Sequence, residues 1–253
     1  LLQTFGFAYD DNFNRAVAVF LRYLSKLSPE HQRIWAAKAL KGNYKLHPDY
    51  YRNSILGDWG TRISIFEAFT QELDLINKMA VLIGKHALFR ESYNSERPKE
   101  FGFLLRPTLA EFNSFVLLLD KMISDNINKE FFAQDLSLEE DHERKDGKII
   151  VRQKGTISLL EEWVRKYFQP ADAEPLDEMF SAFRKIRNLR QKPAHAIKDD
   201  IFDQKYFKDQ RQLVIEAYGA VRTLRLILAN HPNVIGDPPE IGEYLYDGKI
   251  WDI

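Results

Sequence analysis

Apolar residues recur at three- and four-residue steps through much of the chain, a spacing that places their side chains along one face of an α-helix. The pattern is clearest in residues 66–83, 109–123 and 206–229. An earlier stripe follows Asp10, Asp11 and Asn12, which are candidate N-caps, and consists of Phe13, Val17, Phe20, Leu24 and Leu27. The periodicity therefore predicts that helices dominate the fold.

Helix-start signals indicate three more helices. One begins near Ser28-Pro29-Glu30, one runs from Gly155-Thr156 through Tyr167, and one extends from about Leu176 to Arg190. Residues 42–60 are typical of irregular chain with one short helix. Asp146-Gly147, next to a β-branched run, predicts a small hairpin or exposed flap.

These elements predict an all-α fold, a multi-helix bundle with at most a small hairpin. Pro98, Gly102 and Pro107 interrupt residues 90–107, which we expect to link two helical parts. The expected division has three parts, namely a helical N-terminal subdomain of unknown role at 1–104, a helical domain at 105–235 and an extended C-terminal tail at 236–253.

Composition narrows the classes of partner. The 36 Lys and Arg nearly balance the 37 Asp and Glu, so nucleic-acid affinity would need a local basic patch. The longest clean apolar run, Phe115–Leu119, is far shorter than the roughly 20 residues of a membrane helix, so no membrane partner is expected. The absence of Cys excludes disulfides and thiolate chemistry, which fits a cytoplasmic location.

The segment whose side chains are best suited to bind a phosphate and transfer a proton is Leu189 to His195. Arg190 supplies a permanent planar cation, and His195 carries the side chain that titrates near neutrality. Pro193 must end or kink the helix near Gln191, which lets His195 turn back toward Arg190 or toward the same groove in a second copy of the chain. Residues 181–198 contain no acidic side chain, and their basic residues include Arg184, Lys185, Arg187 and Lys192.

Two interpretations of this segment remain open. In the functional one, His195 acts as general acid or base on RNA and Arg190 stabilises charge on the phosphate. In the structural one, Arg190 pairs with a carboxylate such as Asp199 or Asp200, and His195 caps or packs. A similar spacing, Arg225 and His231, lies at the end of an ordinary amphipathic helix and is attributed to chance.

The helical context and the R-x4-H pattern of Arg190 and His195 resemble the HEPN superfamily over about residues 105–232. The resemblance implies a homodimer whose protomers build one composite site, with His195 as acid or base and Arg190 as phosphate-binding residue. Arg184, Arg187, Gln191 and Lys192 would contact RNA. Gln191 stands where active members often have Asn or Asp.

The resemblance implies a metal-independent endoribonuclease of toxin–antitoxin or defence systems, with an antitoxin-like protein as partner. The alternative is a non-catalytic module that binds RNA, a nucleotide or a protein. No cofactor is expected, and the sequence contains no Gly-rich phosphate loop. It also lacks the GxSxG elbow that carries a serine nucleophile.

Two further candidates carry less weight. The six His are scattered without an HxxxH pair, so no metal site is expected, and Asp141-His142-Glu143 is attributed to a solvated charge run. The aromatic cluster at 46–52 is interpreted as a surface loop held by tyrosines, with stacking on RNA bases as the alternative.

Overall fold

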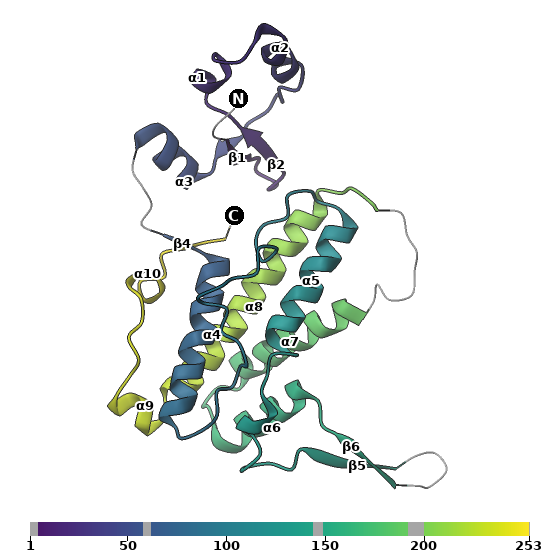
Figure 1. Cartoon of the computed structure of the whole chain (residues 1–253), viewed down its shortest axis with the longest axis vertical. Helices are drawn as coiled ribbons and strands as arrows, with labels where there is room; N and C mark the ends of the chain where they lie inside the picture. The colour runs from purple at the N-terminus through teal and green to yellow at the C-terminus, as the bar shows by residue number, and fades with distance from the viewer. Residues whose placement is uncertain (1–4, 58–61, 144–148, 192–199, 253) are drawn as a thin grey trace. The chain divides into compact units, whose positions relative to one another are not determined.

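A computed structural model of the chain describes residues 5–57, 62–143, 149–191 and 200–252. The fold is mixed, with 53% helix, 12% strand and three small sheets, so the all-α prediction is wrong. The described residues divide into two compact units that meet in sequence between Arg62 and Ile63. Figure 1 draws the elements of each unit.

The N-terminal unit contains a three-stranded antiparallel sheet. Its central strand β1 (Gly6–Tyr9) pairs with β2 (Arg15–Ala18) on one side and with β3 (Lys45–Leu46) on the other. Its helical segments are short: α1 (Leu21–Leu24), α2 (Pro29–Ala37), α3 (Pro48–Tyr51) and the π-helical η1 (Arg52–Leu56).

The helix expected over Phe13 to Leu27 is therefore replaced by a strand and a short helix. Asp10 does not cap a helix; its Oδ1 accepts hydrogen bonds from the backbone N–H groups of Asn12 and Asn14, at 2.9 and 2.8 Å. This Asx-type turn, with Phe13 at a φ of 59°, reverses the chain into β2. The helix start at Ser28 is confirmed, because its hydroxyl caps α2.

The second unit is built around five longer helices, and α8 packs against both α4 and α7. Helix α5 contacts α7 and α8, and α6 contacts α7 (Figure 1). The predicted stripes form this core, so these helices are confirmed within a few residues: α4 (Ile65–Leu82), α5 (Leu109–Ile123), α6 (Thr156–Tyr167), α7 (Glu174–Gln191) and α8 (Lys205–Ala229).

Smaller elements complete the second unit. The predicted hairpin is present as antiparallel β5 (Glu139–Glu143) and β6 (Ile149–Gln153). A 3₁₀ turn, η2 (Lys129–Phe131), follows α5. Strand β4 (Ile63–Ser64) pairs in parallel with β7 (Ile250–Trp251).

The C-terminal segment is not simply extended. It contains α9 (Pro232–Gly236) and α10 (Glu243–Tyr246) before β7. Leu245 is buried, and the Trp251 ring stacks on Phe103 with 5.5 Å between centroids. Apolar anchors spaced along the segment thus hold it against the unit despite its Pro and Gly content.

The expected boundary at 104/105 also differs from the observed division. Phe101 and Leu104 lie in the segment assigned to a linker, yet both are buried in the core that contains α4 and α5. The Gln210 side chain accepts the N–H of Leu104 at 3.0 Å. Proline and glycine here shape a loop that covers the core rather than separating two domains.

Candidate functional site

The candidate site lies at the C-terminal end of α7. The apolar stripe of this helix is buried and consists of Leu176, Met179, Phe180, Phe183 and Ile186. Arg187 and Arg190 continue in this direction, as the spacing predicts. Both guanidinium groups therefore reach α5 and the residues that follow it.

Two aspartates meet these arginines. Arg187 Nη1 lies 3.0 Å from Asp120 Oδ2 and 2.7 Å from Asp125 Oδ1. Arg190 Nη1 lies 2.5 Å from Asp120 Oδ2 and 2.7 Å from Asp125 Oδ2. We call Asp120, Asp125, Arg187 and Arg190 the arginine–aspartate cluster.

Burial explains why the cluster forms. Asp120 is completely buried in the last turn of α5, and an unpaired buried carboxylate would be costly. The two guanidinium groups bind only one of its oxygens. Asp120 Oδ1 and Ser124 Oγ are buried with no hydrogen-bond partner among the described residues.

The cluster also fixes the charge states of its members. Burial raises the pKa of Asp125, but hydrogen bonds from Arg187 and Arg190 outweigh it, and the net pKa lies below the usual value. The hydrogen bonds to Asp120 and Asp125 raise the pKa of Arg190. Both shifts favour the ionised forms of Asp125 and Arg190.

The other predicted site residues do not join the arginine–aspartate cluster. Arg184 forms an ion pair with Glu161, and Lys185 lies 2.6 Å from Glu216. Gln191 is the last residue of α7, with an exposed side chain. Lys192 and His195 lie outside the described residues. Each described cation of the expected basic patch thus has a carboxylate partner.

The structural interpretation predicts Asp199 or Asp200 as the partner of Arg190. Asp199 lies outside the described residues, and Asp200 instead accepts the backbone N–H of Ala110 at 2.9 Å. Sequence reasoning missed Asp120 and Asp125 because they precede the arginines by more than 60 residues. Asp120 did carry a signal, since it interrupts the apolar stripe of a core helix.

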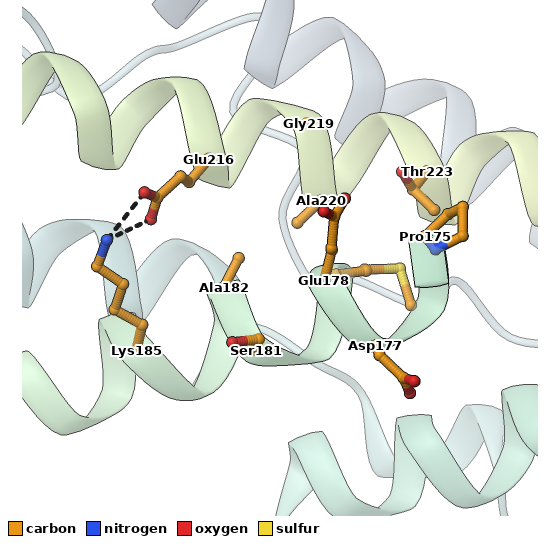
Figure 2. A pocket seen from close by; sticks show the side chains of 11 residues that line it. Pro175, Asp177, Glu178, Ser181, Ala182, Lys185, Glu216, Gly219, Ala220 and Thr223 are labelled. Carbon is orange, nitrogen blue, oxygen red and sulfur yellow. Dashed lines mark hydrogen bonds and ion pairs between the residues drawn. The ribbon is translucent and has the colours of Figure 1, made fainter. Parts of the chain in front are cut away.

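A groove of about 690 Å³ lies between α7 and α8, shown in Figure 2. Small residues on both helices leave this space, notably Ala182 and Gly219. The Lys185–Glu216 ion pair spans the groove at one end, and Glu178 lines it further along (Figure 2). The arginine–aspartate cluster does not line this groove.

The remaining candidates have structural contacts. Arg225 pairs with buried Glu72, and His231 caps α9 by accepting the N–H of Asn233. In the aromatic cluster, the Tyr50 hydroxyl accepts the N–H of Phe20 at 3.3 Å, and its ring covers Gly6. These contacts agree with a loop held by tyrosines.

Two other kinds of feature are absent from the residues that the structure describes. These residues contain no group of three or more His, Asp or Glu side chains arranged to hold a metal ion. No helix in the same part of the chain has the length and apolar character needed to cross a membrane.

Comparison of the chain with models of known protein families, with curated proteins and with solved structures finds no match.

Proposed function

We propose that the second unit is an RNA-binding module that contacts the phosphodiester backbone through Arg187 and Arg190. One observation carries the proposal: the carboxylates hold both guanidinium groups through Nη1 alone. Nη2 and Nε of each arginine have no hydrogen-bond partner among the described residues. The side chains are 38% and 30% exposed and are held in place by the carboxylates, which supports a phosphate contact through the remaining donors.

Charge sets the strength expected of such a site. The two aspartates cancel the charge of the two arginines, so the cluster would orient a phosphate more than attract it. Lys192 follows α7 directly in the sequence and would add a further positive charge to those of the arginines. We therefore expect weak, strongly salt-dependent binding.

A second candidate function is cleavage of the bound RNA. It is favoured by the position of His195, five residues after Arg190 and beyond Pro193. In a HEPN-like arrangement, His195 would deprotonate the ribose 2′-OH and return a proton to the leaving 5′ oxygen. Arg190 would stabilise the charge on the phosphate, and the products would carry 2′,3′-cyclic phosphate ends without a metal ion.

Binding is tested with a fluorescent single-stranded RNA at several salt concentrations in EDTA. Arg190→Lys keeps a cation beside Asp120 but loses the planar fork, so we expect affinity to fall about tenfold. Arg152→Lys, the same exchange at an exposed position of β6, is the matched control and should leave affinity unchanged. Wild-type protein that shows no salt-dependent RNA binding would refute the proposal.

The same mixtures test cleavage. Cyclic-phosphate ends produced by wild type but not by His195→Ala would establish the endoribonuclease. If both proteins bind RNA and neither cleaves it, the result supports an RNA-binding module without nuclease activity. Folding of each variant is matched by circular dichroism.

A further inference from the structure

A third arginine lies beside the arginine–aspartate cluster. Arg90 Nη1 lies 3.4 Å from the backbone carbonyl oxygen of Asp125. The side chain of Asp125 bridges Arg187 and Arg190, with one carboxylate oxygen 2.7 Å from each. Three guanidinium groups therefore meet at one residue, two at its carboxylate and one at its backbone carbonyl.

Hydrogen bonds fix the backbone of Arg90 in this position. Its N–H donates to the carbonyl oxygen of Asn126 at 2.9 Å. The buried Asn126 side chain binds the next residue twice, accepting the N–H of Glu91 at 2.9 Å and donating to its carbonyl oxygen at 2.7 Å. On the other side, Phe89 forms an antiparallel bridge with Ile127. The exposed Arg90 side chain thus extends from a well-anchored segment.

Arg90 differs from the arginines of the cluster in its charge balance. Among the described residues, its side chain has the Asp125 carbonyl as a partner and no carboxylate. The adjacent Glu91 acts instead on Tyr93, whose pKa is raised by burial and then by this negative charge. Arg90 therefore adds a positive charge that no described carboxylate offsets.

A role in capping α5 accounts for only part of the Arg90 side chain. Asp125 follows α5 by two residues, and carbonyl groups at a helix C-terminus lack partners within the helix and favour a nearby cation. The contact with Asp125 uses Nη1 alone. The other N–H groups of the guanidinium are left for a further acceptor.

We propose that Arg90 is a third phosphate-binding residue, which contacts the same RNA strand as Arg187 and Arg190. This assignment rests on the proposed function of the cluster. Arg187 and Arg190, held by carboxylates, orient a phosphate through their planar forks. Arg90 contributes attraction to the RNA backbone, because its charge is not offset.

The salt dependence of RNA binding tests this division of roles. Wild type, Arg90→Gln and Arg90→Lys are titrated with a fluorescent single-stranded RNA in EDTA. One lost contact lowers the slope of log affinity against log salt by about 0.7. We therefore expect Arg90→Gln to lose affinity about eightfold at about 50 mM salt and about threefold at about 200 mM. Arg90→Lys keeps the charge and should retain the wild-type slope.

Arg97→Gln is the matched control, because it removes the same charge from the same loop. Phe89, next to Arg90, donates its N–H to Asn77 in the C-terminal half of α4. Arg97 Nη1 instead lies 3.5 Å from Ser64 Oγ, at the start of α4. Positions 64 and 77 are about 20 Å apart along a helix, so this variant should bind RNA as wild type does.

The outcomes separate this assignment from the proposed function. If Arg190→Lys weakens binding while Arg90→Gln keeps the wild-type slope, the RNA-binding module stands and the role of Arg90 is refuted. Equal losses in Arg90→Gln and Arg97→Gln would also refute it, since any arginine of the loop would then serve. An unchanged slope with a lower thermal unfolding midpoint in Arg90→Gln would assign Arg90 to capping α5. Wild-type protein without salt-dependent binding would refute the proposed function itself.

Discussion

Arg225 of α8 forms an ion pair with Glu72 of α4 inside the second unit, where the two side chains are 8% and 0% exposed. Burial raises the pKa of Glu72, although the charge of Arg225 acts in the opposite direction. Glu72 Oε1 has no hydrogen-bond partner among the described residues. The pair therefore joins the two helices that pack most extensively, and it leaves part of the carboxylate unsatisfied.

Removing one partner should be far more costly than removing both. We expect Arg225→Met to lower the free energy of unfolding by about 3–5 kcal/mol, because Glu72 would be left as an uncompensated buried charge. Arg225→Met combined with Glu72→Leu should recover most of that loss. Urea denaturation of wild type, Arg225→Met, Glu72→Leu and the double variant measures the coupling, and strictly additive losses would contradict it.

Tyr218, also on α8, gives a titration signal from the same region. Burial, followed by the negative charge of Glu72, raises the pKa of Tyr218 from 10.0 to about 12. The folded state therefore holds this proton more tightly than the unfolded chain does. The corresponding stability is fully present below pH 10 and is lost as pH rises toward about 12.

Phenolate absorbance of wild type and Tyr218→Phe should be indistinguishable near pH 10.5, where exposed tyrosines titrate. Their difference should develop only near pH 12 or with alkaline unfolding. A Tyr218 contribution already visible at the ordinary tyrosine pKa would show that this phenol is not shielded.

The arginine–aspartate cluster should make stability sensitive to acid. Because the net pKa of Asp125 is lowered from 3.8, its ionised form stabilises the fold above that pH. The contribution is lost as pH falls through the lower, folded-state pKa. Asp125→Asn should be less stable than wild type at pH 6, and the difference should shrink toward pH 2.

Thermal unfolding of both proteins between pH 2 and 6 measures this effect. Asp209→Asn, at an exposed position of α8, is the control and should track wild type closely. A constant difference between Asp125→Asn and wild type across the range would mean that the ionised carboxylate is not what stabilises the cluster.

Asp135 holds the end of α6 through Trp163 and Tyr167, and it also binds Lys85, which follows α4. Its Oδ2 accepts the indole N–H of Trp163 at 2.6 Å and pairs with Lys85, while Oδ1 accepts the Tyr167 hydroxyl at 3.1 Å. Asp135→Ala leaves the Trp163 and Lys85 donors without their acceptor, so we expect the free energy of unfolding to fall by about 2–4 kcal/mol.

Asp135→Asn retains one acceptor oxygen and should lower the free energy of unfolding by roughly half as much as Asp135→Ala does. Guanidinium denaturation followed by circular dichroism ranks the two variants. Equal stability of Asp135→Ala and wild type would show that the three contacts contribute little.

The helices of the second unit could be predicted because each buries one regular stripe, as Phe66 to Ile83 and Leu109 to Ile123 show. The N-terminal unit could not, because its strands are four residues or shorter and its apolar residues are not sorted onto one buried face. Arg190 was identifiable as an unusual inward-facing cation. Its partner Asp120 was not, since only the packing of α5 against α7 brings the two together.

The parallel pairing of Ile63 with Ile250 brings the first and last strands of the second unit together. Chain entry and exit therefore lie about one strand spacing apart, roughly 5 Å. A fold with adjoining ends can be circularly permuted, or placed within a loop of another protein, without stretching either connection. The ends of the second unit are thus close enough for the whole unit to be inserted into a loop of another protein.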